Sequence, residues 1–143
     1  MLMGEYFHTA DAKGRVILPT DLRDELGESF VVTKGLDACL FLYTDAEWKV
    51  LADKLQKLPM AKPEARAIVR FFFSGARQVS CDKQGRFLIP PNLREFAGLD
   101  KEVVWLGMSS RLELWSRSRW QQYNDKIEPA AAELAGMLTD LGI

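Results

Sequence analysis

The sequence predicts an α+β protein, rich in β-structure, in which two similar half-domains pack about a pseudo-twofold axis. Three observations support this prediction. The chain repeats itself once, short apolar runs of strand length alternate with turn residues, and longer segments show helical spacing. The 143 residues suffice for one ordinary domain or for two small units that share a core. Apolar residues make up 48% and charged residues 27%, which is a globular composition.

The internal repeat is the most informative feature of the chain. The first copy reads Asp-Ala-Lys-Gly-Arg-Val-Ile-Leu-Pro from Asp11, and the second reads Asp-Lys-Gln-Gly-Arg-Phe-Leu-Ile-Pro from Asp82. The offset of 71 residues (82 minus 11) becomes 72 after one inserted residue, and the match extends to Trp48 and Trp120. A solenoid needs about three or more stacked units. Two copies therefore favour a pseudo-symmetric pair.

Each copy is predicted to contain the same elements. A tight Asp-x-x-Gly turn joins two strands, and the second strand is an apolar run, suited to burial, that ends at proline. A short helix stopped by glycine follows, and then a hairpin-like pair of strands. The predicted segments are strands 15–18, 30–33 and 40–43 with helix 20–26 in the first copy, and strands 86–89, 102–106 and 112–115 with helix 91–97 in the second.

Helices are predicted after each copy. Thr44-Asp45-Ala46-Glu47 is a capping box that begins a helix, which Pro59 to Pro63 ends, and a second helix is expected from Glu64 to about Phe73. After the second copy we expect a helix over 117–127, an interruption at Pro129, and a weak or frayed helix over 130–141. The expected organisation is half-domain 1 at 5–50, a helical linker at 51–75, half-domain 2 at 76–120, and a C-terminal helix and tail at 121–143.

Charge and cysteine content exclude several classes of protein. The net charge of −1 gives no strongly basic balance, so any cations that bind nucleic acid must be local or multiplied by assembly. Cys39 and Cys81 form no C-x-x-C pair and join no histidine cluster, which argues against a metal site and favours a reduced cytosolic protein. The start of the chain lacks signal-peptide features, and no apolar run is long enough to span a membrane. We expect a cytoplasmic protein.

The sequence offers no catalytic site. His8 is the only histidine, and the chain has no G-x-S-x-G elbow, P-loop or G-x-G-x-x-G motif. A carboxylate dyad of Asp11 with Asp82 across the pseudo-twofold axis is conceivable, but basic residues lie beside both. We therefore expect no enzyme activity, no cofactor, no metal and no small-molecule substrate.

The repeated loop is the candidate binding site. Arginine fits the O6 and N7 acceptors of guanine, lysine suits phosphate contacts, and glycine lets a partner approach the backbone closely. Aspartate can shape the turn and hold the arginine extended. The candidate DNA-binding residues are Lys13, Arg15, Lys83 and Arg86, and the candidate loop-shaping residues are Asp11, Gly14, Asp82 and Gly85. The turns of a duplicated fold would give the same pattern. These residues alone are therefore consistent both with DNA-binding loops and with plain structural turns.

Over nearly its whole length the chain resembles the MraZ proteins of bacteria. The residues that carry this resemblance are Gly4-Glu5-Tyr6, Asp11-x-Lys13-Gly14-Arg15 leading to Pro19, Leu22-Arg23, Asp82-x-x-Gly85-Arg86 leading to Pro90, Leu93-Arg94, and Leu112-Glu113-Leu114-Trp115. The resemblance implies two AbrB-like swapped-hairpin half-domains in a double-split β-barrel. It also assigns Asp11, Lys13 and Arg15 to the first DNA-binding motif and Asp82 and Arg86 to the second. In the second motif Gln84 stands where the first has Lys13, and Lys83 is the nearest cation.

The same resemblance implies a function. It implies a sequence-specific transcriptional regulator that binds double-stranded DNA at short direct repeats. The regulator implied by this resemblance usually represses the cell-division and cell-wall gene cluster, which includes the regulator's own gene. It further implies ring-shaped homo-oligomers associated with the nucleoid. Two alternatives stay open, an AbrB-like antitoxin that neutralises a partner protein and an oligomeric interaction protein whose loops are plain turns.

Overall fold

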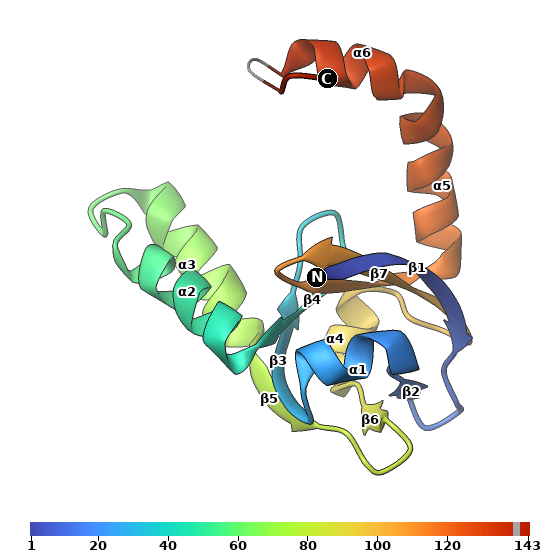
Figure 1. Ribbon diagram of the computed structural model, residues 1–143. Helices are drawn as coiled ribbons and strands as arrows, with labels where there is room; N and C mark the ends of the chain where they lie inside the picture. The colour runs from blue at the N-terminus through green and yellow to red at the C-terminus, as the bar shows by residue number, and fades with distance from the viewer. Residues whose placement is uncertain (139–140) are drawn as a thin grey trace.

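The computed structural model describes residues 1–138 and 141–143 and shows an α+β protein (Figure 1). The strands are β1 (Leu2–Thr9), β2 (Arg15–Ile17), β3 (Ser29–Lys34), β4 (Leu40–Thr44), β5 (Arg77–Ser80), β6 (Arg86–Leu88), β7 (Glu102–Ser109) and β8 (Leu112–Ser116). The α-helices are α1 (Thr20–Leu26), α2 (Asp45–Gln56), α3 (Pro63–Gly75), α4 (Pro91–Phe96), α5 (Arg117–Ile127) and α6 (Ala131–Met137), with a 3-10 turn η1 (Glu128–Ala130) before α6. The predicted fold class is confirmed.

The two copies of the repeat exchange strands. Within the described residues, one antiparallel sheet has the order β1-β7-β8-β4-β3-β5, and β2 pairs with β6 in a separate antiparallel ribbon. Strand β1 of the first copy thus pairs with β7 of the second, and β5, which leads into the second copy, pairs with β3 of the first. This exchange agrees with the swapped-hairpin arrangement that the resemblance implies, and it means that the two copies share one core.

The strand registers show the pseudo-twofold relation between the copies. In the ribbon, Val16 pairs with Phe87, its own equivalent at the offset of 71. In the sheet, Phe41 pairs with Glu113, its own equivalent at the offset of 72. A residue can pair with its own equivalent only where the symmetry axis passes between them. The axis therefore runs through the centre of the ribbon and the centre of the sheet.

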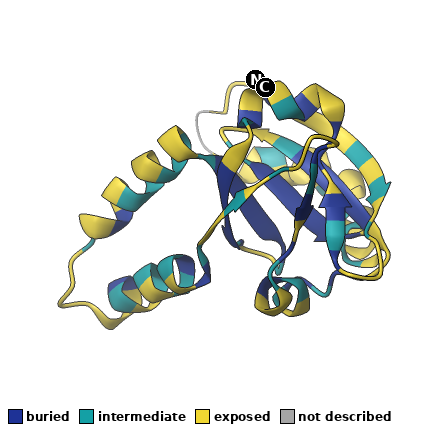
Figure 2. Cartoon of the chain, turned by 90° about the horizontal axis from the view of Figure 1, so that it is seen from below, coloured by how far each residue is buried: buried dark blue, intermediate teal, exposed yellow. Residues whose placement is uncertain are grey.

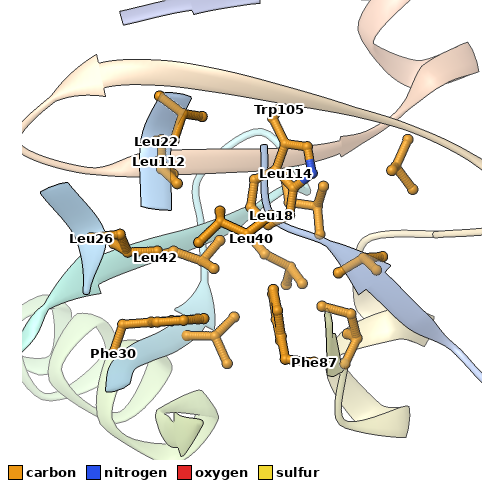
Figure 3. Close-up of a cluster of buried hydrophobic side chains, with 14 of the residues drawn as sticks. Leu18, Leu22, Leu26, Phe30, Leu40, Leu42, Phe87, Trp105, Leu112 and Leu114 are labelled. Carbon is orange, nitrogen blue, oxygen red and sulfur yellow. The ribbon is translucent and has the colours of Figure 1, made fainter. Parts of the chain in front are cut away.

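The main core lies between the sheet, the ribbon and the short helices α1 and α4 (Figure 3). Phe30 and Phe87 meet edge to face with ring centroids 5.0 Å apart, and the buried Trp105 donates from Nε1 to the carbonyl oxygen of Ile17 at 3.1 Å. Aromatic side chains remove large apolar areas from water, and the Trp N–H needs an acceptor when it is buried. Side-chain contacts thereby hold the ribbon against the sheet, in addition to the backbone segments that connect the two.

The apolar runs 15–18 and 86–89, predicted as buried strands, are buried on one face only. Val16 and Phe87 are 1% and 4% exposed and point into the core, whereas Ile17 and Leu88 are 38% and 53% exposed. The reason is that β2 and β6 form an isolated ribbon, so alternate side chains of each strand face outward. The prediction that burial extends along these runs is wrong.

The predicted helices are confirmed with small shifts at their ends. The Thr44 hydroxyl accepts from the N–H of Glu47 at 3.1 Å and caps α2, as the capping box predicts. Helices α2 and α3 form an arm on one side of the sheet, and α5 to α6 form a second arm on the other side (Figures 1 and 2). The predicted tail helix is present as α6, and positions 139 and 140 of that prediction lie outside the described residues.

A second apolar cluster holds the first arm against the sheet. Phe41 of β4 and Phe72 of α3 stack with centroids 6.4 Å apart, and the Thr33 hydroxyl donates to the carbonyl oxygen of Phe72 at 2.7 Å. The phenylalanine run that ends α3 is thus partly core, as expected. In the part of the chain that the structure describes, the helices are too short or too polar to cross a bilayer.

Candidate functional site

Each Asp-x-x-Gly segment folds into a turn that its own aspartate closes. Asp11 Oδ1 accepts from the backbone N–H groups of Lys13 and Arg15, both at 2.9 Å, and the N–H of Gly14 donates to the carbonyl oxygen of Asp11 at 3.0 Å. A side-chain acceptor that replaces a backbone one is the reason that aspartate favours such turns. The first loop is therefore shaped by Asp11 and Gly14 together.

The second loop repeats this geometry. Asp82 Oδ1 accepts from the N–H groups of Gln84 and Arg86, both at 2.9 Å, and the N–H of Gly85 donates to the Asp82 carbonyl oxygen at 3.0 Å. Gly14 and Gly85 have φ angles of +84° and +79°, a region that L side chains rarely adopt. Both copies thus build the same loop from the same residue types.

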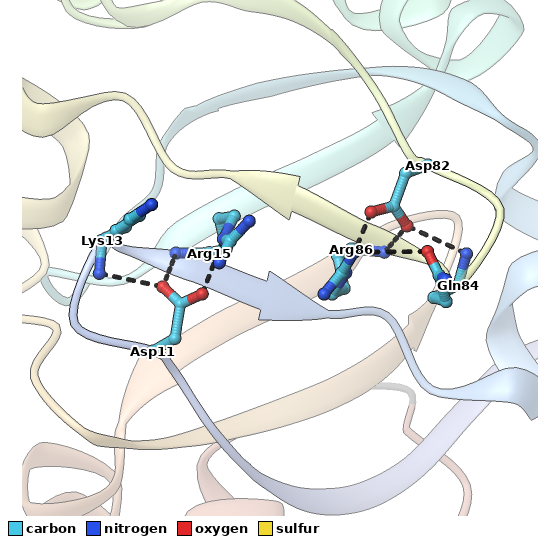
Figure 4. Close-up of polar contacts among 6 residues, drawn as sticks. All are labelled: Asp11, Lys13, Arg15, Asp82, Gln84 and Arg86. Carbon is cyan, nitrogen blue, oxygen red and sulfur yellow. Dashed lines mark hydrogen bonds and ion pairs between the residues drawn. The ribbon is translucent and has the colours of Figure 1, made fainter.

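Each aspartate also holds the arginine at the start of the following strand. Asp11 Oδ2 lies 2.6 Å from Arg15 Nε, and Asp82 Oδ2 lies 2.9 Å from Arg86 Nε (Figure 4). An Nε contact does not use the terminal edge of the guanidinium, formed by Nη1 and Nη2. That edge carries the parallel N–H groups that match the O6 and N7 acceptors of guanine.

The electrostatics of the loops follow from these contacts. The backbone N–H of Arg15 is the main cause that lowers the pKa of Asp11, and the N–H of Arg86 has the same effect on the pKa of Asp82. The Arg side chains lower both values further. Both carboxylates are therefore ionised at neutral pH and suited to hold a guanidinium rather than to exchange protons.

The two arginines project from one face of the ribbon. Arg15 is paired with Leu88 and Arg86 with Ile17, and alternate residues of a strand share a face, so the outer face carries Arg15, Ile17, Arg86 and Leu88. Because the strands are antiparallel, the two loops lie at opposite ends of the ribbon (Figure 4). The conceivable dyad of Asp11 with Asp82 is thus not formed, since each carboxylate binds its own arginine.

The structure adds two arginines that sequence reasoning did not assign to the site. A Cβ placed on Gly14 would lie 2.1 Å from Arg94 Nη1, and one placed on Gly85 would lie 2.2 Å from Arg23 Cζ. Arg94 follows the second loop in sequence yet covers the first, and Arg23 covers the second loop while its Nε donates to the carbonyl oxygen of Leu18 at 2.8 Å. The repetition of Leu22-Arg23 as Leu93-Arg94 was the available signal.

The loops differ in charge. Lys13 and Lys83 are both exposed, but they occupy different positions of their turns, because Gln84 is the equivalent of Lys13. The Gln84 Oε1 accepts from Arg86 Nη2 at 3.3 Å, so the second loop restrains its arginine with a neutral group as well as with Asp82. The two ends of the ribbon are therefore alike in shape and unlike in charge distribution.

Beside each loop lies a shallow depression. The first has a volume of about 610 Å³ and is lined in part by Asp11, Gly14, Arg94 and Lys101, and the second has a volume of about 330 Å³. Their linings mix acidic and basic groups on the surface, unlike the mostly apolar walls of a typical small-molecule pocket. Among residues 1–138 and 141–143, no group of three or more His, Cys, Asp or Glu side chains is placed to hold a metal ion.

Comparison with known proteins places these features in a family. A family model described as "MraZ protein, putative antitoxin-like" matches residues 1–71 and again residues 72–140. A protein of Desulfitobacterium hafniense named "Transcriptional regulator MraZ" is 57% identical over 143 residues, which cover 100% of both chains. Proteins with the same name from Thermoanaerobacter sp. strain X514 and Clostridium tetani are 53% and 50% identical over the same full length.

Proposed function

Since the chain belongs to the MraZ family, whose compared members are named transcriptional regulators, we propose that it regulates transcription by binding double-stranded DNA through the outer face of its β2–β6 ribbon. The family is one of regulators rather than enzymes. The observation that carries the proposal is the pair of Asp-held arginines on that face, Arg15 and Arg86. As a DNA-binding regulator it would work in the cytoplasm, at the nucleoid.

The dimensions of the ribbon support this mode of binding. The major groove of B-DNA is about 12 Å wide and admits a two-stranded ribbon. Arg15 and Arg86 occupy diagonal positions of adjacent strands, which are about 7–8 Å apart. With base pairs spaced about 3.4 Å along the helix, the two arginines are separated by about two base-pair steps. We propose that each reads a guanine, with Lys13 and Lys83 on nearby phosphates.

The strength of binding depends on assembly. One chain offers only a few cations near the ribbon, so we propose weak, salt-sensitive binding of one unit to one short repeat. Several units joined in a ring-shaped homo-oligomer would bind several direct repeats at high effective concentration. By resemblance to the family, the proposed targets are repeats before the cell-division and cell-wall gene cluster and its own gene, with repression as the outcome.

Exposed apolar side chains on the second arm support self-association. Leu134 and Met137 of α6 are 38% and 67% exposed, and Leu138 directly after it is 60% exposed. Clustered apolar exposure favours burial against a partner. Deletion of residues 131–143 is expected to lower the number of chains per particle, measured by sedimentation. The same exposed helix also suits the antitoxin alternative, in which a different protein covers it and the deletion leaves the number of chains per particle unchanged.

The decisive experiment measures DNA binding by fluorescence anisotropy across a salt series. The probe is the DNA upstream of the protein's own gene, compared with scrambled DNA of the same composition. Arg15→Ala with Arg86→Ala is expected to abolish the preference for the upstream DNA. The control, Arg70→Ala with Arg77→Ala, removes the same charge from exposed arginines outside the ribbon and is expected to keep it. Equal loss in both variants, or in neither, would refute the ribbon as the reading surface.

A further inference from the structure

We infer that Ile17 and Leu88 are specificity-determining residues that bind the C5-methyl groups of thymines in the major groove. The inference rests on the proposed DNA-binding function and goes beyond it, because it assigns a base preference to side chains that carry no charge. Ile17 and Leu88 occupy equivalent positions of the two copies, at the offset of 71. They stand on the face that also presents Arg15 and Arg86.

The isolated ribbon explains why these two side chains face outward, but core packing in the described chain does not require them to be aliphatic. Ile17 and Leu88 are 38% and 53% exposed. The core contacts come from Val16, which precedes Ile17, and from Phe87, which precedes Leu88. An outward position on a two-stranded ribbon accepts a polar residue without loss of core packing. Aliphatic side chains in both copies therefore indicate that this face meets an apolar group during function.

The four outer side chains alternate in chemistry. Arg15 is directly opposite Leu88, and Ile17 is directly opposite Arg86, so each aliphatic side chain lies beside an arginine. Opposite Cβ atoms in such a pair are about 4.5–5.5 Å apart, between one and two base-pair steps. In the major groove only thymine presents a methyl group, and apolar side chains recognise it by contact. The face is therefore suited to a thymine within one or two base pairs of each guanine.

Charge distinguishes this occupant from a second copy of the chain. Two ribbons packed face to face would bring the guanidinium groups of Arg15 and Arg86 against those of the other copy, and like charges at an interface are unfavourable. DNA instead supplies phosphates around the groove and methyl groups within it. The combination of cations and aliphatic side chains on one face thus fits thymine-containing DNA better than it fits self-association.

The first test changes the DNA and leaves the protein intact. Full-length protein is titrated against the upstream DNA made with thymine or with uracil, which lacks only the methyl group, and against scrambled DNA in both forms. Binding to the upstream DNA is expected to weaken by about fourfold for one lost contact and about 15-fold for two. These factors correspond to about 0.8 kcal/mol per buried carbon. If the upstream DNA is preferred but uracil changes nothing, DNA binding stands and the inference fails.

The second test asks whether the two side chains are responsible. Ile17→Ser with Leu88→Ser is expected to bind thymine DNA as wild type binds uracil DNA, with no further loss on uracil DNA. Leu36→Ser is the matched control, because Leu36 is also 53% exposed, and it is expected to behave as wild type. A variant that stays as sensitive to uracil as wild type, or one that loses its oligomeric state in sedimentation, would overturn the inference.

Discussion

The guanidinium of Arg94 lies over Gly14, although the two residues belong to different copies of the repeat and are far apart in the sequence. A Cβ on Gly14 would approach Arg94 Nη1 to 2.1 Å, and the equivalent contact joins Arg23 to Gly85. Each loop is thus covered by the helix of the opposite copy, α4 or α1. The strand exchange that builds the fold also completes the two Asp-x-x-Gly loops.

Replacement of Gly14 by alanine separates backbone strain from this contact. Gly14→Ala is expected to lower the free energy of unfolding by about 1–2 kcal/mol, because a left-handed φ is unfavourable for a residue with a Cβ. Arg94 is flexible at its end and can move away, so the loss should be nearly the same with Arg94→Ala present. Urea unfolding of wild type, of Gly14→Ala, of Arg94→Ala and of the double variant measures the loss in each background. A cost that disappears in the Arg94→Ala background would mean that the contact, and not the backbone, is responsible. Gly136→Ala, at an open helical position, serves as the control.

Asparagine at both loop aspartates tests whether the held arginines provide specificity. Asp11→Asn with Asp82→Asn keeps the Oδ1 acceptor for the backbone N–H groups but weakens the charge-assisted bond to Nε. The affinity for scrambled DNA is expected to rise, because two negative charges are removed, while the preference for upstream DNA falls. Anisotropy titrations measure both. Asp53→Asn with Asp125→Asn is the control, and an unchanged preference in the loop variant would contradict the role of the carboxylates.

The lowered pKa values of Asp11 and Asp82 predict a pH dependence of stability. A carboxyl group whose pKa is lower in the folded chain stabilises the fold above its unfolded value, close to 3.8, and loses this contribution as the pH falls through the folded value. The stability difference between wild type and Asp11→Ala with Asp82→Ala is therefore expected to be constant near neutral pH and to shrink in acid. Urea unfolding between pH 7 and pH 2.5 checks this. A stability difference between wild type and variant that grows in acid would contradict the prediction that the ionised carboxylates stabilise the fold.

Glu113 is the buried charge at the pseudo-twofold axis of the sheet. It is 7% exposed, accepts from Arg111 Nη2 at 2.8 Å and from Trp115 Nε1 at 3.0 Å, and Arg111 lies over the Phe41 ring at 4.4 Å. Glu113→Ala leaves both donors without this acceptor and is expected to destabilise the fold by about 3 kcal/mol. Glu113→Gln retains an acceptor and should cost about 1–2 kcal/mol. Thermal unfolding compares the two variants, and equal losses would mean that the negative charge of Glu113 sets the cost and that a neutral acceptor cannot replace it.

Local features of the fold were readable from the sequence because local interactions determine them. The Asp-x-x-Gly turns, the capping box at Thr44 and the short helix between Pro19 and Gly27 depend on residues within a few positions of one another. The repeat predicted two alike halves, and the resemblance identified the loops that the structure places at the ends of one ribbon.

Strand partners and exposure were decided by tertiary structure. Nothing local indicates that β1 pairs with β7 or that β2 pairs with β6, because strand pairing depends on which edges meet after the chain has folded. The same pairing exposes Ile17 and Leu88, whose sequence context suggests burial, and places Arg23 and Arg94 over the loops of the opposite copy. The sequence by itself thus determined the elements and the loop chemistry. The interleaving of the two halves determined which side chains share a surface, because those contacts join residues about 70 positions apart.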